Sequence, residues 1–565
     1  MHLFIQTFAS AFQMMLDPSI LLVMLLGAVI GSVAGSLPGI TTTLAVSVTL
    51  PFTFSMSPTA AVAFLVAITV GVNYGNSIPA ILVGVPGNPS AVLTAIDGYK
   101  LHIRGESGLA LGTQYFAALI GQLVSTVFFV ALVVPLSQLL YVFLTPELWA
   151  LHLLGLTAVV SLVGKNAFKG MVAALFGLAV AFVGPDPVSL MPRFTFGFFE
   201  LRSGFEVVPV VIGVLAISEL IRSSRQIYAW KEVSGGFRGK FPSWHHLRSM
   251  LKPILIGAVA GTGFGVVPGA GGTAGTFIAY QQAKVWSKHP EEFGNGSVEG
   301  LAANESAQNA GQAGDMVPTF GFGIAGSGSM VLLLAALTVH GIVPGPLLVK
   351  ETPEMLYAAT AGLIGAALIL GIIGWPIAKA LLHIVTIDRS VVLTVALVMS
   401  IVGVYALRNS TYDVVVMMAF GVVGYFMLRY GYSVAAFALA VVLGENFEGL
   451  LRRGILLEGG DFGAFVSRPI TAAMIVASIV LLALGIASTM RASRKAKTRA
   501  AGAVETDPDG ISALITAAQA EVAKTTRAEL ESEDEHNAAA TKVATEKKST
   551  RTPPHPTDDE RQHPE

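Results

Sequence analysis

Two polar clusters interrupt the hydrophobic stretches of this chain, and both carry side chains suited to ligand binding. The first cluster is NYGNS, residues 73–77, and the second is ANESAQNA, residues 303–310. Their amide, hydroxyl and carboxylate oxygens could hold a cation such as Na⁺. Neither cluster contains Lys or Arg, so an anionic ligand would depend on backbone N–H groups and helix N-termini, with hydroxyl and amide donors adding contacts. These residue types predict a binding site for a solute, an ion or both.

Glycine-rich motifs flank each polar cluster and recur at a fixed distance. The motif GAVIGSVAGSLPGI, residues 27–40, returns as GAVAGTGFGVVPGA, residues 257–270. Four glycines and one proline are shifted by 230 residues between the two copies. A second pair of motifs follows the clusters, VGVPGNPS at 83–90 and FGIAGSGS at 322–329. The chain therefore contains two repeated halves, each with two glycine-rich breaks.

The glycines and the prolines of these motifs predict different things. Glycine at every fourth residue forms one helix face that lets a second helix approach closely, which is the expected role of glycines 27, 31, 35, 257, 261 and 265. Proline removes a backbone donor, so helices should end near Pro38 and Pro268. Unpaired backbone groups in lipid cost several kcal/mol each and are tolerated only where they are buried in protein or line a watery cavity. Paired breaks of this kind indicate the binding site of a transporter.

The expected site residues come from the four breaks and the two clusters. Glu305 is the ionisable group among them, and we expect it to bind a proton or Na⁺. No permanent metal site is expected, and Na⁺ would bind only transiently. The first half supplies Pro38, Gly39, Thr41, Thr42, Thr43, Asn73, Tyr74, Gly75, Asn76, Ser77, Pro86 and Gly87; the second supplies Pro268, Gly269, Gly271, Thr273, Asn304, Glu305, Asn309, Gly326 and Ser327.

Composition places these motifs in a membrane. Of the 565 residues, 53% are hydrophobic and 13% are charged, whereas soluble domains carry about 25% charged residues. Apolar runs long enough to cross a bilayer, which takes roughly 20 residues, recur along the chain. The sequence therefore predicts an all-α polytopic membrane protein with about ten to twelve transmembrane segments, in two repeated halves, with broken or re-entrant helices at the Gly/Pro motifs.

Charge and composition also divide the chain. We expect an interfacial N-terminal segment (1–17), a first repeat (18–221), a basic cytoplasmic connector (222–252), a second repeat (253–490) and a disordered cytoplasmic tail (491–565). Basic residues of the connector and of the segment after the last span set the orientation. No Lys or Arg precedes Lys100, so we expect the N-terminus outside and the two halves in opposite topology.

Several other functions fit the sequence less well. The chain has no cysteine and a net charge of −1, so disulfides and thiolate metal sites are excluded and no nucleic-acid partner is expected. GAGGTAG lacks a surrounding βαβ unit, and GVVPGAGGT lacks the lysine of a P-loop. We find no catalytic residue set, so an enzyme is not expected. A membrane-embedded enzyme, an ion channel and a non-transporting receptor remain the alternatives to a transporter.

The motifs also resemble a known family, the large permease subunit of tripartite tricarboxylate transporters (TctA). The similar segments, in order, are GSLPGITTT, NYGNSIPAILVGVPGNPSAVLTAIDGYKL, RFTFGFFEL, FGNGSVEGLAANESAQNA, VHGIVPGP and LGENFEGLLRRGILLEGGDFGAFVSRPI, which together extend over about 20–490. The resemblance implies a secondary transporter of the bacterial inner membrane, driven by Na⁺ or H⁺ and without another cofactor. It also implies two partners, a small four-helix membrane subunit and a periplasmic substrate-binding protein, and a carboxylate substrate.

Two positions depart from the family pattern. Ala325 stands where the family usually has proline, and Asn76 stands at a glycine position. Both lie in segments expected to form the site. They fit a carboxylate other than citrate, the substrate for which the family is named.

Overall fold

The computed structural model describes residues 2–37, 40–139, 143–162, 166–224, 241–268, 271–345, 348–384 and 389–506. Its contacts define two units, Met1–Thr489 and Met490–Glu565. The described residues are almost entirely helical, which confirms the predicted fold class. The helix α21, Pro469–Thr506, includes residues 491–506, which we expected to be disordered; residues 507–565 of the expected tail lie outside the described part.

The elements of the first half begin with the short helix α1. In order they are α1 His2–Met15, α2 Pro18–Ser36, α3 Thr42–Thr49, η1 Leu50–Ser55, α4 Pro58–Val83, η2 Pro89–Ala91, α5 Val92–Ile103, α6 Ser107–Leu139, α7 Thr145–Leu162, α8 Ala167–Ala181, β1 Gly184–Pro185, β2 Pro192–Arg193, η4 Glu200–Ser203, α9 Val207–Ile212, η5 Gly213–Ile217 and α10 Ser218–Ser224.

The second half begins with α11, inside the segment expected to be a connector. Its elements are α11 Trp244–Gly265, α12 Gly271–Trp286, η6 Pro290–Glu292, α13 Val298–Phe322, α14 Gly328–Val339, α15 Leu348–Glu351, α16 Pro353–Ile384, α17 Arg389–Arg408, α18 Thr411–Arg429, α19 Val434–Leu457, α20 Phe462–Ser467 and α21. Residues 225–240 of the expected connector lie outside the described part.

The glycine motifs pack helix against helix in the same way in both halves. A Cβ on Gly31 of α2 would collide with the backbone of Ile68 in α4, and a Cβ on Gly261 of α11 would collide with the backbone of Ala307 in α13. The neighbouring glycines behave alike: Gly27 and Gly35 face Phe64 and Val72, while Gly257 and Gly265 face Ala303 and Gly311. Equivalent contacts in the two halves are shifted by 230 residues on the helix that carries the glycines and by 239 residues on the helix that it contacts. The expected close packing is confirmed, and the repeat extends to individual contacts.

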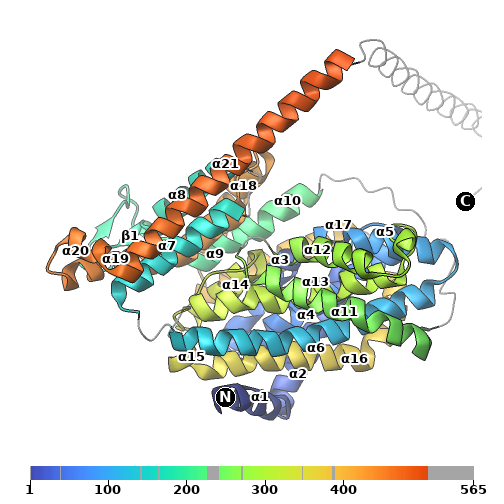
Figure 1. Ribbon diagram of the computed structural model, residues 1–565. Coiled ribbons are helices and arrows are strands. Elements are labelled where there is room, and N and C mark those ends of the chain that lie inside the picture. The colour runs from blue at the N-terminus through green and yellow to red at the C-terminus, as the bar shows by residue number, and fades with distance from the viewer. Residues whose placement is uncertain are drawn as a thin grey trace, which may run out of the picture. The chain divides into compact units, whose positions relative to one another are not determined.

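Each half contributes one long helix that packs against the other half. Helix α6 of the first half packs on α13 of the second, and α16 of the second half packs on α4 of the first. Together with α1, α2, α11 and α12 they form one group of helices, which we call the core bundle (Figure 1). Polar α13 is buried along nearly its whole length there. The halves are therefore interlocked around the two helices that carry the polar clusters.

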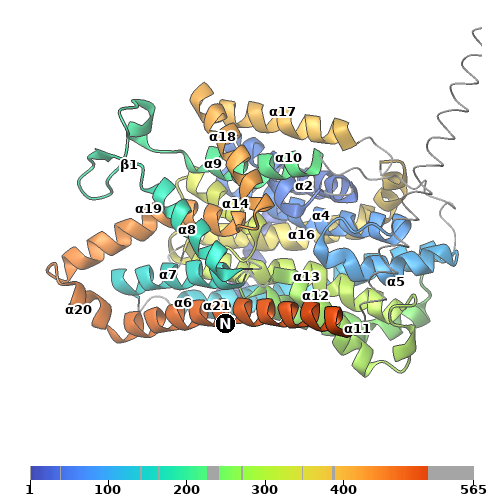
Figure 2. The same cartoon turned by 90° about the horizontal axis from the view of Figure 1, so that it is seen from above.

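A second group of helices, the side bundle, also follows the repeat. Helix α8 packs on α19, and α18 packs on the continuous stretch α9–η5–α10 (Figure 2). Both pairs join a helix of the first half to one of the second. Helices α3 and α14 contact elements of both bundles and connect them. These two short helices, each of which follows one of the expected breaks in the sequence, thus lie where the bundles meet.

The four expected breaks all fall between helices, but the residues that end the helices are not always the prolines. Helix α4 ends at Gly84 with φ 74°, and α13 ends at Gly323 with φ 71°. This left-handed backbone favours glycine. It explains why the helix ends before Gly326 although Ala325 stands where the sequence resemblance leads us to expect proline. The polar clusters, in contrast, lie inside the continuous helices α4 and α13 rather than in unwound segments.

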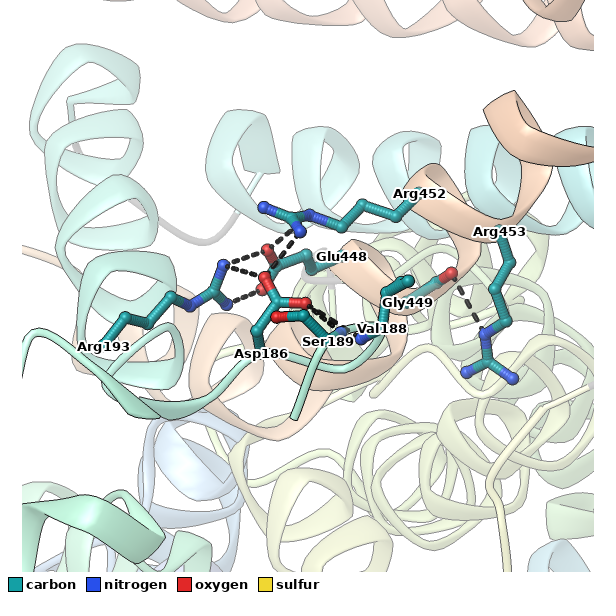
Figure 3. A network of polar contacts seen from close by, with 8 residues as sticks. All are labelled: Asp186, Val188, Ser189, Arg193, Glu448, Gly449, Arg452 and Arg453. Atoms are coloured by element: carbon teal, nitrogen blue, oxygen red, sulfur yellow. Dashed lines mark hydrogen bonds and ion pairs between the residues drawn. The ribbon is translucent and has the colours of Figure 1, made fainter. Parts of the chain in front are cut away.

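A two-stranded hairpin, β1–β2, lies between α8 and α9 in the sequence, whereas α18 and α19 of the second half are joined by a short turn. Asp186 accepts hydrogen bonds from the backbone N–H groups of Val188 (2.9 Å) and Ser189 (2.8 Å). Arg193 pairs with both Asp186 and Glu448 of α19, and Arg452 pairs with the same two carboxylates (Figure 3). This network attaches the hairpin to the side bundle.

Length and composition allow eight helices of the described part to cross a membrane. They are α2, α4, α6, α9–η5–α10, α16, α18, α19 and α21. Four shorter apolar helical stretches accompany them: 42–55, 167–181, 328–339 and 393–408. The expected ten to twelve crossings, the opposite topology of the halves and the boundaries of the five segments stay predictions.

Candidate functional site

A cavity of about 390 Å³, lined mainly by polar residues, lies where the breaks of the two halves approach each other. Residues from α3, η2, α12, α13 and α14 form most of its wall, and the side bundle closes the rest. The lining residues are Thr41, Thr42, Thr43, Asn73, Asn88, Pro89, Ser90, Leu215, Glu219, Gly272, Thr273, Gln308, Gly311, Gln312, Asp315, Ser327, Gly328, Ser329, Leu428, Val434 and Ala435.

Three helices begin at this cavity. Thr41 is the N-cap of α3, and its hydroxyl accepts a hydrogen bond from the N–H of Leu44 at 3.2 Å. Ser327 is the N-cap of α14, and its hydroxyl caps no backbone N–H. Thr273 lies in the first turn of α12. Helix N-termini carry partial positive charge and free N–H groups, so this part of the wall favours an anion.

One face of α13 forms the opposite part of the wall. Gln308, Gln312 and Asp315 are spaced so that they share a helix face, and all three line the cavity. Asn73 of α4 donates to Gln312 Oε1 at 2.5 Å, and Gln308 donates to the carbonyl oxygen of Asn73 at 3.0 Å. Asn73 and Gln312 differ by the 239-residue shift of the repeat. Equivalent positions therefore meet, as in an interface between two-fold related parts.

Two carboxylates line the cavity, and their surroundings differ. Glu219 of α10 is paired with Arg222, whose guanidinium donates to it at 2.9 and 2.5 Å. Asp315 is only 7% exposed, and its Oδ1 has no hydrogen-bond partner among the described residues. None of the described lining residues is Lys, Arg or His. Asp315 is thus a buried acid that faces the cavity without an ion-pair partner in the described part of the chain.

Glu305 lies behind the cavity wall rather than on it. Its carboxylate accepts hydrogen bonds from the hydroxyls of Ser77 (2.7 Å) and Thr94, and it has no exposed surface. Asn304 donates to the same Thr94 hydroxyl at 2.7 Å. The polar groups of the second cluster therefore connect α13 to α4 and α5, which fits a structural role.

The structure brings six of the expected residues together on the cavity wall. These are Thr41, Thr42, Thr43, Asn73, Thr273 and Ser327. Others belong to the helices or breaks around the cavity without lining it: Tyr74, Gly75, Asn76, Ser77, Pro86, Gly87, Pro268, Gly271, Asn304, Glu305, Asn309 and Gly326. Pro38, Gly39 and Gly269 lie outside the described residues.

The expected set omitted several residues that do line the cavity. Gln308, Gln312 and Asp315 follow the helical spacing i, i+4, i+7, a signal that would have found them once α13 was taken as a continuous helix. Asn88, Ser90 and Ser329 belong to the second pair of breaks. Glu219 comes from a distant apolar segment, and no local pattern marks it.

The fold and the cavity define a class: a multi-pass membrane protein of two interlocked repeats, with helix breaks around a polar cavity. Residues 21–439 match the family described as "Tripartite tricarboxylate transporter TctA family". The chain belongs to this family, which confirms the resemblance of its motifs.

The chain is also similar to two curated proteins of Agrobacterium vitis. It is 32% identical over 448 residues to an "Uncharacterized 52.8 kDa protein in TAR-I ttuC' 3'region", covering 79% of this chain and 89% of that protein. It is 31% identical over 234 residues to an "Uncharacterized protein in TAR-II ttuC' 3'region", covering 41% and 97%. No solved structure matches.

Proposed function

We propose that this protein is the large permease subunit of a binding-protein-dependent secondary transporter. It imports tricarboxylates or related carboxylates across the bacterial inner membrane together with Na⁺ or H⁺. Membership of the tripartite tricarboxylate transporter family supports this proposal. The partners are a periplasmic binding protein, which delivers the carboxylate, and a small four-helix membrane subunit.

The observation that carries the proposal is the meeting of three helix N-termini at one polar cavity. Carboxylates bind well to helix N-termini and to hydroxyl donors such as Thr43, Thr273 and Ser329. The volume of about 390 Å³ lies at the small end of ligand sites and suits a small organic acid. Because no Lys or Arg lines the described wall, a substrate with several negative charges benefits from a cation that travels with it.

The cavity also suits alternating access. It is bounded by short helices that connect the core bundle to the side bundle, so a movement between the bundles would open it to one side or the other. Interlocked helices make the core bundle the more rigid part. Binding of anion and cation together lowers the net charge that must cross an environment of low dielectric constant.

Reconstitution with the partner subunits tests the proposal. Proteoliposomes containing the chain, a matching small subunit and a matching binding protein should take up at least one radiolabelled acid from a panel of di- and tricarboxylates when a Na⁺ or proton gradient is imposed. Thr273→Val should reduce this uptake at least tenfold, because it removes a hydroxyl from the cavity wall.

Thr276→Val is the matched control. Thr276 lies one turn further along α12, is buried away from the cavity, and donates to the carbonyl oxygen of Thr273 at 2.7 Å. Its variant should keep most of the uptake. If no acid in the panel is accumulated under either gradient, the proposed function is wrong; equal uptake by the two variants would remove Thr273 from the site.

A further inference from the structure

We propose that Asp315 is the carboxylate that binds the coupling cation, and that this cation is Na⁺. The inference rests on the proposed function, because it assigns the cation site of the same cavity. It replaces Glu305, the acid that the sequence favours, with a second acid of the same helix.

The surroundings of the two acids decide between them. Glu305 accepts hydrogen bonds from two hydroxyls and does not reach the cavity. Asp315 lines the cavity, is more than nine-tenths buried, and has an oxygen without a hydrogen-bond partner in the described part of the chain. An unpaired buried carboxylate is costly, so a bound cation would satisfy it.

Several residues that carry side-chain oxygens line the cavity together with Asp315, and oxygen ligands are what a site for a hard cation requires. Ser327 and Ser329 line the same cavity as Asp315, and their hydroxyl oxygens lie 3.1 Å apart. The break after α13 packs closely on Asp315: a Cβ on Gly326 would collide with the Asp315 backbone. Thr319 stabilises this turn: its hydroxyl donates to the Asp315 carbonyl oxygen at 2.7 Å and accepts from the Gly326 N–H at 3.4 Å. Carbonyl groups of an unwound segment are suitable Na⁺ ligands.

Comparison of the two repeats shows that the carboxylate of the proposed cation site is present in one half only. Asp315 and Asn76 differ by the 239-residue shift, so they occupy equivalent positions on α13 and α4. The break that follows each helix packs on them, with Gly326 against Asp315 and Gly87 against Asn76. Asn76 is neutral and does not line the cavity. Among its described lining residues the cavity therefore has one unpaired carboxylate, Asp315, beside Glu219, which is paired with Arg222.

The proposed site also places the cation next to the anion. Ser327 lines the cavity together with Asp315 and is the N-cap residue of α14, whose N-terminus favours negative charge. A Na⁺ at Asp315 and a substrate carboxylate at the start of α14 would therefore lie next to each other, beside Ser327. Each would then strengthen binding of the other, which is the energetic basis of coupled transport.

Na⁺ binding to the purified full-length chain tests the site without any substrate. The melting temperature of the wild-type protein in detergent should rise when NaCl replaces choline chloride, because a ligand that binds the folded state stabilises it. Asp315→Asn should weaken the apparent Na⁺ affinity at least tenfold. Glu305→Gln, in the same helix, should keep the wild-type Na⁺ affinity even if its melting temperature in choline is lower. If Asp315→Asn does not fold, Ser327→Ala should weaken Na⁺ affinity instead.

Three results would overturn the inference: a wild-type Na⁺ response in Asp315→Asn, loss of the response in Glu305→Gln alone, or a melting temperature that responds to pH but not to Na⁺. These results are separable from the proposed function. Carboxylate uptake that is driven by protons alone would leave the transporter intact and reject the Na⁺ site. Na⁺ binding at Asp315 without uptake of any acid in the panel would support the Na⁺ site and reject the proposed transport function.

Discussion

At the scale of single residues, the glycines of α11 show how sharply the packing discriminates between positions. Gly261 and Gly263 are two residues apart on one helix. A Cβ on Gly261 would collide with Ala307, whereas a Cβ on Gly263 would meet nothing within 4 Å. The same substitution therefore has opposite expected effects at the two positions.

We predict that Gly261→Ala lowers the stability of the protein, since an added methyl group in a closely packed helix contact costs typically about 1–3 kcal/mol. Gly263→Ala should leave the stability equal or slightly higher, because Ala has the better helix propensity by about 1 kcal/mol. Thermal unfolding of the two variants in detergent measures the difference. Equal melting temperatures would mean that α11 and α13 are not in close contact.

Residue chemistry also marks the limit of what the sequence predicts. Glu305 and Asp315 are both acids in a polar stretch, and nothing in their neighbours identifies the one that faces the cavity. The rotation of α13 about its axis decides this, and that rotation is set by contacts of Gly257, Gly261 and Gly265 with α13. The hydroxyls Thr41–Thr43, Thr273 and Ser327 were predictable, since residues that follow a break begin the next helix.

At the scale of elements, the breaks could be predicted from glycine and proline, although the causes differ from the expectation. Gly84 and Gly323 end the long helices, while Pro86 lies further along the loop. The continuity of α4 and α13 through NYGNS and ANESAQNA was not predicted, because polar residues in an apolar chain resemble a loop. Burial of both segments between helices supplies the hydrogen-bond partners that make the helices stable.

The hairpin β1–β2 carries a prediction about pH. Hydrogen bonds from the N–H groups of Ser189 and Val188, together with the nearby Arg452, hold the pKa of Asp186 below its usual range. A carboxylate whose pKa is lowered on folding stabilises the folded state above its unfolded pKa of about 3.9, and that stabilisation is lost as the pH falls through the folded value. The hairpin should therefore be equally ordered from neutral pH to about 5 and loosen below about 4.

A spin label at Ser203 can measure this loosening, because Ser203 lies in η4, which packs on β1. The chain has no cysteine, so Ser203→Cys gives a single labelling site. The label should be restrained at neutral pH and become mobile in acid. Asp186→Asn should make it mobile already at neutral pH. Glu200→Gln, at an exposed carboxylate of the same segment, should change little. An unchanged acid response in Asp186→Asn would show that another group controls the hairpin.

At the scale of the whole molecule, the exchange of α6 and α16 makes the halves dependent on each other. Helix α6 packs on α13, and α16 packs on α4. A half expressed alone would therefore expose the helix faces that pack against the other half. The interlocking explains how a chain with short, broken helices forms one compact unit from Met1 to Thr489.

We predict that a chain divided within residues 225–240 assembles from its two parts. When both fragments are co-expressed, a tag on the first should purify the second, and the pair should keep the Na⁺-dependent melting temperature. Each fragment expressed alone should aggregate or be degraded. Recovery of either fragment as a monodisperse monomer would contradict the interlocked arrangement.

The shared shift between the contacts of Gly31 with Ile68 and of Gly261 with Ala307 points to descent from a duplicated gene. In a pair of identical ancestral chains, the position of Asn73 would have touched its own copy, as Asn73 touches Gln312 now. Such a pair must carry two acids or none where Asp315 and Asn76 stand. A lone acid there became possible only after fusion freed each copy to mutate separately, so the charge of the cavity could then evolve in single steps.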